Sequence, residues 1–301
     1  MDNSPASQEA LAQYQAAQAA AAMAEFPDWG VLRFAGPERA KFLQGLMTSD
    51  VSALKPGQSG WSCLLTAKGR IRAHVLLIGR EEEIWALGPA AALDNMVADF
   101  SRVIVLSQTT MSRAEDLSAP VLLLGPQARV TAARAAESGA ATASDERFAP
   151  PGAWIFSPKG EADKILSGAA RLGSEAFEML RLESGVPAFG RELGEETFPQ
   201  EALLDACVSL TKGCYLGQEI MSRLSRRGHV NRLLVRLKIS GLKVPAAGAQ
   251  VSVQGRETGA VASAAWSPRA DAALALAFVR CEDAAAGAKL DLPGGISAEV
   301  V

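Results

Sequence analysis

The sequence predicts an α+β protein whose C-terminal part is a separate β-rich unit. Helix-like and strand-like patterns alternate over the first 230 residues, and most links between successive strands are too short to contain a crossover helix. From residue 231 the chain changes to short alternating runs that are broken by glycine turns. Short links favour α+β layers over a doubly wound parallel sheet, and glycine-punctuated strands are typical of a small barrel.

The N-terminal half begins with a helix and continues with strands. Residues 7–24 are rich in Ala, Gln and Leu, which are common in helices. Residues 61–65 and 71–78 have strand patterns and are joined by the short turn 66–70, so we expect a hairpin. The other elements expected here are strands at 29–34 and 84–87 and helices at 39–47 and 90–100.

The next hundred residues have a mixed pattern. We expect β structure at 103–106, 121–124 and 153–157, and helices ending near residue 138 and over 161–171 and 174–183. Polar residues at 139–146 predict a surface loop, and apolar residues at near-helical spacing over 203–210 predict a buried element.

Composition limits the kinds of function. Hydrophobic residues make up 49% and charged residues 21% of the 301-residue chain, and the formal net charge is -3. These values are typical of a soluble globular protein and argue against a protein that binds polyanions with its whole surface. No apolar run approaches the ~20 residues of a membrane span, and residues 1–5 lack the basic start of a signal peptide. We therefore expect a cytoplasmic protein without membrane contact.

The four cysteines are scattered, without a C-x-x-C pair or a histidine at ligand spacing. This arrangement argues against disulfides and predicts no metal site. Cys63, Cys207 and Cys281 lie among apolar or small residues and are expected to pack in the interior.

The segment 212–220, Lys-Gly-Cys-Tyr-Leu-Gly-Gln-Glu-Ile, is the strongest candidate site. Two glycines flank its Cys-Tyr-Leu core, which indicates a tight turn that another group can approach closely. Lys212 and the arginines that follow the segment can favour the thiolate of Cys214 by lowering its pKa. Cys214 could then act as a nucleophile, as a transient cluster or metal contact, or as a redox-sensitive thiol.

Residues 212–219 resemble the signature of the YgfZ family, folate-binding relatives of the glycine-cleavage T-protein that act in iron–sulfur protein maturation and tRNA modification. Further blocks that resemble the superfamily, in the same order, are 36–51, 68–71, 181–187, 198–201, 258–259 and 263–268. The resemblance implies a cloverleaf of three small domains around a central channel that holds tetrahydrofolate. Its expected parts are an N-terminal helical extension at 1–24, two interleaved α+β subdomains within 25–230, and a β-barrel at 231–301.

The resemblance also implies site residues. Glu183 is expected at the pterin ring, where a carboxylate can accept two N–H bonds from the aminopyrimidine edge. Trp29 and Phe177 are expected to line the folate site with flat rings, Phe177 in a place often held by tryptophan. Arg223, with Arg226 and Arg227, is expected at the glutamate tail of the folate. Cys214 and Lys212 are the implied catalytic residues, and Gly213, Tyr215, Gly217, Gln218 and Glu219 complete the motif.

One departure separates this chain from the aminomethyltransferases of the superfamily. Those enzymes carry an Asp-Asp pair just after the block that corresponds to 68–71, whereas this chain has Arg72, Ala73 and His74. Without those carboxylates the methylamine-transfer chemistry loses its acidic group, so the departure argues against glycine cleavage and leaves open whether the protein is an enzyme.

The favoured hypothesis is a folate-binding accessory protein that supports the assembly or repair of iron–sulfur enzymes and, through them, tRNA modification. Its expected partners are a reduced folate and iron–sulfur client enzymes. Direct contact with tRNA is the less favoured interpretation of the basic residues between 212 and 243, because no aromatic-interleaved RNA motif accompanies them. The alternatives are a tetrahydrofolate-dependent one-carbon transferase and a binding scaffold without chemistry.

Overall fold

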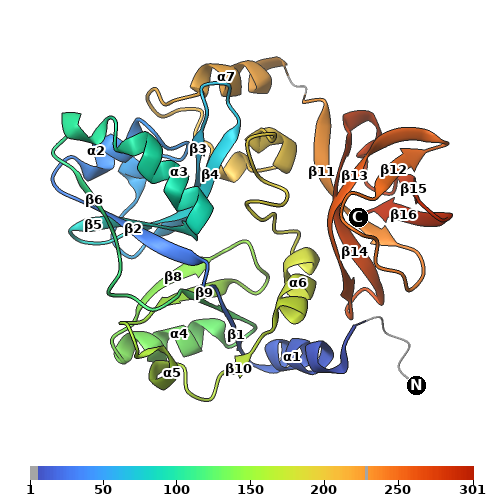
Figure 1. Ribbon diagram of the computed structural model, residues 1–301, viewed down its shortest axis with the longest axis horizontal. Helices are drawn as coiled ribbons and strands as arrows, with labels where there is room; N and C mark the ends of the chain where they lie inside the picture. The colour runs from blue at the N-terminus through green and yellow to red at the C-terminus, as the bar shows by residue number, and fades with distance from the viewer. Residues whose placement is uncertain (1–5, 228–229) are drawn as a thin grey trace.

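The computed structural model describes residues 6–227 and 230–301, which form two open five-stranded sheets and a closed barrel. The two open sheets lie on one side of helix α6 (Ser174–Glu183) and the barrel lies on the other (Figure 1). This arrangement confirms the predicted α+β class with a C-terminal barrel. The expected domain boundaries remain predictions, and β1 (Ala22–Glu25), which spans one of them, is a strand of an open sheet.

The first sheet is antiparallel and has the strand order β3-β4-β5-β2-β6. Helices α2 (Arg39–Gln44) and α3 (Ala90–Phe100) contribute to the core on one of its faces, where Leu43, Leu93 and Phe100 are buried with strand residues. Its strands are β2 (Trp29–Ala35), β3 (Ser59–Leu65), β4 (Ile71–Gly79), β5 (Glu83–Pro89) and β6 (Thr110–Arg113).

The second sheet has the order β10-β1-β7-β9-β8, and only its β1–β10 pair is parallel. Helix α4 (Ala128–Glu137) packs on one face through small side chains, which let the helix approach the sheet closely. The other strands of this sheet are β7 (Val121–Leu124), β8 (Ala141–Asp145), β9 (Gly152–Phe156) and β10 (Ala170–Arg171). The short helix α5 (Ala162–Ile165) lies between β9 and β10 in the chain.

The barrel closes in the order β11-β14-β13-β12-β15-β16 around its own apolar core. Alternation along its strands sends every second side chain inward, as the sequence of β11 (Arg232–Ile239) predicts. The other strands are β12 (Gln250–Val253), β13 (Arg256–Ser267), β14 (Ala272–Arg280), β15 (Lys289–Leu292) and β16 (Ile296–Val300).

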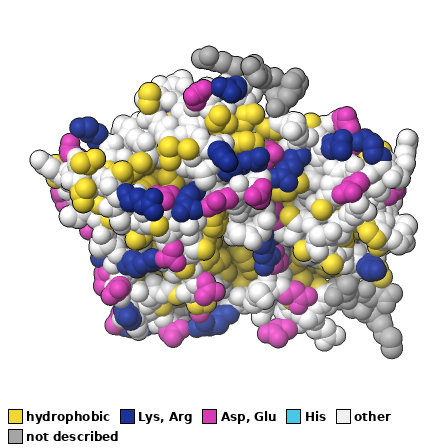
Figure 2. All heavy atoms as spheres, turned by 45° about the horizontal axis from the view of Figure 1, so that its top comes forward, with side chains coloured by type: hydrophobic (Ala, Val, Ile, Leu, Met, Phe, Trp, Pro, Cys, Tyr) yellow, Lys and Arg dark blue, Asp and Glu magenta, His cyan; other side chains and the backbone are white. Residues whose placement is uncertain are grey.

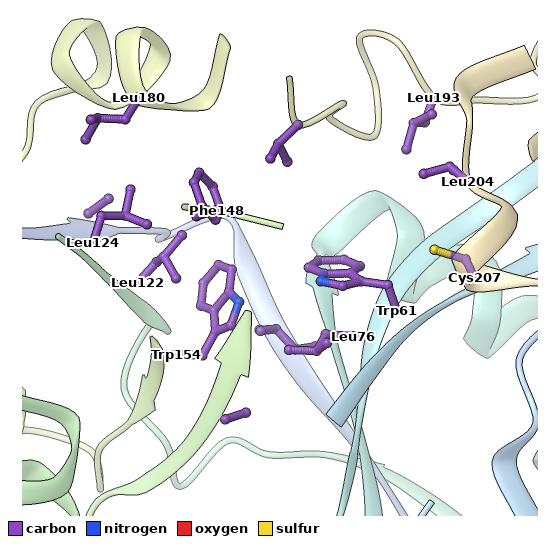
Figure 3. Close-up of a cluster of buried hydrophobic side chains, with 14 of the residues drawn as sticks. Trp61, Leu76, Leu122, Leu124, Phe148, Trp154, Leu180, Leu193, Leu204 and Cys207 are labelled. Carbon is purple, nitrogen blue, oxygen red and sulfur yellow. The ribbon is translucent and has the colours of Figure 1, made fainter. Parts of the chain in front are cut away.

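The largest core joins these parts. It lies between the two open sheets, α6 and α1 (Gln8–Ala19), and contains Trp61, Leu76, Leu122, Phe148 and Trp154 (Figure 3). No helix among the described residues is long and apolar enough to cross a membrane.

Several predicted elements were wrong, because tertiary pairing overrides local propensity in short segments. The helix expected over 7–24 ends at Ala19, and residues 139–146 contain strand β8 rather than only a loop. Residues 103–106, expected to be β structure, contain a 3-10 turn at Ile104–Leu106. Residues 203–210, expected to be a buried element, contain a 3-10 turn at Asp205–Cys207. The helix expected over 161–171 is replaced by the short helix α5 and the strand β10.

Candidate functional site

A pocket of about 200 Å³ lies among the two open sheets and α6, and we name it the aromatic pocket. Trp29 and Phe177, predicted from distant parts of the sequence, both line it, and the ring of Phe26 lies 5.0 Å from Trp29 and 5.2 Å from Phe177. Its charged lining residues are Glu178 and Arg181 of α6, together with Arg147 and Arg191. The aromatic lining residues are Phe26, Trp29, Trp61, Phe148, Trp154, Phe177 and Phe189.

Five of these seven aromatic residues were not identified from the sequence. The signal that could have found them is weak: aromatic residues make up 6% of the chain, yet three of its five tryptophans line this one pocket. Because the residues come from different strands and loops, only the packing of the two sheets brings them together. Figure 3 shows Trp61, Phe148 and Trp154 approaching one another from separate segments.

A buried carboxylate fixes two of the indole rings. The Asp145 side chain accepts hydrogen bonds from Trp61 Nε1 and Trp154 Nε1, both at 3.1 Å, and is paired with Arg147. Burial alone would raise the pKa of Asp145, but the Arg147 guanidinium and the hydrogen bonds hold it below its ordinary value. The guanidinium carbon of Arg147 also lies 3.4 Å from the centre of the Trp61 ring, which favours a cation–π contact.

His74 contributes a neutral imidazole to the aromatic pocket. Its ring is stacked on Trp61 at 4.6 Å, and burial lowers its pKa to about 3, so it carries no charge near pH 7. The Cys207 sulfur lies 3.8 Å from His74 Nε2, and burial raises the pKa of this thiol to about 11. The two groups therefore form a neutral pair rather than a thiolate–imidazolium pair.

A second, larger cavity of about 740 Å³ lies where the two open sheets meet the barrel, and we name it the central cavity. Its wall is mostly apolar and includes Leu76, Leu234 and Leu276. Trp61, Arg147, Val186 and Pro187 line both cavities, so the two are neighbours that share one wall.

Glu183 is not among the residues that line either cavity. Its carboxylate accepts hydrogen bonds from Tyr14 Oη at 3.0 Å and Ser267 Oγ at 2.5 Å, and Arg269 Nε lies 3.6 Å away. Burial and this carboxylate raise the pKa of Tyr14 to about 12. The structure thus gives Glu183 a role in joining α1, α6 and the barrel, and the carboxylate that lines the aromatic pocket is Glu178.

Lys212 is held inside the fold rather than beside a reacting group. Its ammonium donates to the carbonyl oxygens of Gln44, Met47 and Ser49 at 2.5–2.8 Å. These three carbonyls take up all the ammonium donors, and burial lowers the pKa of Lys212 to about 8. Lys212 therefore ties the motif to the end of α2.

The rest of the motif forms a surface turn that leads into α7 (Gln218–Arg227). Cys214 is exposed, Tyr215 is buried, and the Tyr215 hydroxyl has no partner within the described part of the chain. Gly217 has φ +83° and faces the Thr66 carbonyl, as the expected close approach requires, whereas Gly213 has open space around it. Gln218 and Glu219 are the first residues of the helix.

The predicted tail contact Arg223 lies on α7 and lines neither cavity. It pairs with Glu219 at 2.8 Å, and more than half of its side chain is exposed. The side chains of Arg226 and Arg227 lie outside the described part of the structure.

The remaining cysteines only partly match the sequence prediction. Cys63 and Cys207 are buried as expected, but Cys281 is exposed at the end of β14, so its predicted packing role was wrong. Its thiol donates to the Val230 carbonyl at 2.8 Å. Within residues 6–227 and 230–301, no three His, Cys, Asp or Glu side chains form an arrangement that could hold a metal ion.

Comparison with known proteins gives consistent matches over the chain. The GCVT N-terminal domain matches residues 3–149, and the glycine cleavage T-protein C-terminal barrel domain matches residues 232–301. An aminomethyltransferase of Rubrobacter xylanophilus is 28% identical over 292 residues, 89% of this chain and 78% of the relative. The tRNA-modifying protein YgfZ of Yersinia pseudotuberculosis is 27% identical over 258 residues, 79% of this chain and 78% of the relative.

A solved structure shares the fold. The glycine cleavage system aminomethyltransferase T from Bartonella henselae aligns with a TM-score of 0.88 over 97% of this chain and 88% of that chain, at 22% identity. The three-part architecture is therefore common to both proteins.

Proposed function

Because the chain belongs to the glycine cleavage T-protein superfamily, we propose that it binds a reduced folate with the pterin ring in the aromatic pocket. The observation that carries this proposal is the convergence of seven aromatic side chains, Trp29 and Phe177 among them, beside charged groups that include Glu178 and Arg181. Aromatic faces suit a flat bicyclic ring, and a few convergent polar groups at its edge would orient it.

The polar groups of the pocket fit an aminopyrimidine edge. Glu178 accepts hydrogen bonds from Arg181 at both carboxylate oxygens, each at 2.9 Å, and from Arg191 at 2.6 Å. About a fifth of its side chain is exposed, and its first carboxylate oxygen has a lone pair left to accept one N–H bond from a ligand. His74, being neutral, can donate or accept a hydrogen bond without introducing charge. Trp61 and Trp154, held by Asp145, keep the pocket walls in place before the ligand arrives.

The pocket supports binding better than aminomethyl transfer. Of the segment 72–74, His74 lines the pocket, whereas Arg72 pairs with Asp99 at 2.7 Å and with Glu195 at 2.5 Å. The segment thus offers the bound ligand a neutral imidazole in place of a carboxylate.

We assign to Cys214 the contact with the client proteins, which are the iron–sulfur enzymes that this protein would support. This cysteine lies on an exposed turn and lines neither cavity, so a partner protein could reach it while the folate site is filled. The proposed step is the maturation of iron–sulfur enzymes, including enzymes that modify tRNA, and the relative named tRNA-modifying protein YgfZ agrees with the tRNA part of this role. Lys, Arg, Asp and Glu side chains are mixed on the face in Figure 2, which favours protein clients over direct binding of an RNA backbone.

Tetrahydrofolate binding, measured by calorimetry under anaerobic conditions, tests the folate proposal. We expect Phe177→Leu and Trp29→Leu to weaken binding roughly tenfold, because each removes one stacking ring. Trp85→Leu is the matched control, since Trp85 lies on the same sheet as Trp29 but outside both cavities. If the wild type binds no reduced folate, the proposal is wrong and a scaffold without a ligand replaces it.

The role of Cys214 in the support of client enzymes needs a separate test in cells. Deleting the gene should lower the activity of iron–sulfur enzymes and the level of the tRNA modifications that depend on them. A wild-type copy should restore both, and a Cys214→Ser copy should not, although it binds tetrahydrofolate normally. Full restoration by the Cys214→Ser copy would contradict the assigned role.

A one-carbon transferase is the second candidate, favoured by the relative named aminomethyltransferase. It predicts that the purified protein forms 5,10-methylenetetrahydrofolate from tetrahydrofolate and an aminomethylated carrier protein, or that it demethylates a small methylamine. Absence of both reactions in a preparation that binds tetrahydrofolate would exclude these activities.

A further inference from the structure

Arg236 is a positive charge on the wall of the central cavity, and it has no carboxylate partner among the residues that the structure describes. It projects from β11, and its Nη1 donates to the backbone carbonyl of Glu183 at 2.6 Å. Its buried Nε has no hydrogen-bond partner within the described residues, and none of their carboxylates forms an ion pair with it. A buried N–H without a partner is unfavourable unless another molecule supplies an acceptor.

The other charged residues of this cavity are already compensated. Arg147 is paired with the buried Asp145, and Glu146 is paired with Arg129 in an exposed contact. The apolar wall around Arg236 strengthens any charge–charge contact made there, because it excludes water. Among the described side chains that line the central cavity, Arg236 is therefore the one charged group without an oppositely charged partner.

The two cavities together fit a ligand with a ring and a long anionic tail. The aromatic pocket, at about 200 Å³, is smaller than the ~300–1,000 Å³ typical of sites for drug-sized ligands, so it can enclose a ring system but not a whole folate. The central cavity, at about 740 Å³, begins on the other side of the shared wall. Since Trp61 and Arg147 line both cavities, a tail that passes these two side chains would reach the central cavity.

We propose that Arg236 binds the carboxylates of the ligand's glutamate tail, so that the central cavity selects folates with glutamate residues. This inference rests on the proposed folate site and adds the residue that recognises the tail. It replaces the tail contact expected at Arg223, which lies on α7 outside both cavities and already has a carboxylate partner.

The experiment measures the dissociation constants of three ligands: tetrahydropteroate, which lacks glutamate, tetrahydrofolate, and its triglutamate form. For the wild type we expect the glutamylated ligands to bind more tightly than tetrahydropteroate. Arg236→Gln should reduce this preference roughly tenfold or more, because it removes a charge-assisted contact from an apolar cavity. Binding of tetrahydropteroate itself should change little.

Three further variants make the result specific. Lys238→Gln, two residues along the same strand and outside both cavities, should keep the wild-type preference. Arg223→Gln should also keep it. Arg236→Lys should retain part of the preference, since it keeps the charge, and thermal unfolding of each variant establishes that the measured protein is folded.

The outcomes separate this inference from the folate proposal. If Arg236→Gln is folded and keeps the full preference, or if Arg223→Gln loses it, the tail does not bind at Arg236, although the pterin site stands. If the wild type binds tetrahydropteroate but shows no preference for glutamylated ligands, the inference is also wrong. If the wild type binds none of the three ligands, the folate proposal itself fails.

Discussion

At the scale of single residues, burial decides the chemistry of His74. The sequence gives it no special feature, since it lies in an alternating strand, but the structure encloses it between Trp61 and Cys207. Burial, and then the positive charge of Arg147, lower its pKa to about 3, while the carboxylate of Asp145 acts in the opposite direction. The imidazole is therefore neutral in the folded protein near pH 7.

This shift predicts a pH-dependent stability. In the unfolded chain His74 has a pKa of about 6.5, so below that pH the unfolded state binds one more proton than the folded state. The free energy of unfolding should therefore fall as the pH drops from about 6.5 toward 3, with a contribution of about 1.4 kcal/mol per pH unit. His74→Phe keeps an aromatic ring and should lack this contribution, as measured by urea unfolding between pH 7 and pH 4.

The comparison has an internal control. The chain has two histidines, and His229 is present in both proteins, so the difference in slope reports on His74 alone. Equal slopes for wild type and variant would mean that His74 protonates equally in the folded and unfolded states.

At the scale of elements, the turn before α7 depends on close packing against the hairpin turn 66–70. A Cβ on Gly217 would lie 3.0 Å from the Thr66 carbonyl oxygen and 3.2 Å from the Leu65 side chain, in a backbone conformation that favours glycine. Lys212 holds the other end of the same motif through three carbonyls. The position of Cys214 is thus set by contacts on both sides of it.

The two glycines of the motif should respond differently to alanine. Gly217→Ala should lower the free energy of unfolding by about 1–3 kcal/mol, because it combines a strained backbone with a close contact. Gly213→Ala, with nothing within 4 Å of the added methyl group, should change it by less than about 0.5 kcal/mol. Urea unfolding of both variants tests this prediction. Similar losses in the free energy of unfolding for the two variants would mean that the backbone surroundings of Gly213 and Gly217 differ from those described here.

At the scale of the whole molecule, one buried carboxylate connects three parts that are far apart in sequence. Glu183 is the last residue of α6, and it is bonded to Tyr14 of α1, Ser267 at the end of β13 and Arg269 beyond it. Its own carbonyl oxygen accepts from Arg236 of β11. The barrel and the N-terminal helix are therefore held to α6 at the same point.

Removing this carboxylate should weaken the whole assembly. We expect Glu183→Ala to lower the free energy of unfolding by about 2–4 kcal/mol, because the hydroxyls of Tyr14 and Ser267 lose their acceptor in a buried place. Glu175→Ala, on the same helix with an exposed contact to Ser7, should cost less than about 1 kcal/mol. Chemical unfolding gives both values.

Tetrahydrofolate binding by the same variant separates the two roles considered for Glu183. Since its carboxylate lies outside the aromatic pocket, folded Glu183→Ala should bind with an affinity close to that of the wild type. A large loss of affinity in a fully folded preparation would instead support the pterin contact that the family resemblance implies.

The sequence by itself determined the fold class, most regular elements and the family. The strand-like runs 61–65 and 71–78 with the short turn between them predicted the hairpin β3–β4, and the alternating apolar residues after 231 predicted the barrel. These features depend on residues close together in the chain, whose periodicity records which face is buried. Trp29 and Phe177 were also predicted, and the structure brings both into one pocket.

Only the tertiary structure decided what the charged residues of the site do. Sequence reasoning put Lys212 and Glu183 in reacting or ligand-binding positions, whereas both side chains are engaged with distant parts of the fold. It missed Asp145 because that residue lies in a short polar segment that becomes a strand only by pairing with β9. Burial, hydrogen-bond partners and cavity walls arise largely from contacts between segments that are far apart in the chain, such as Lys212 with Met47 and Trp61 with Asp145, and such contacts leave no periodic pattern in the chain.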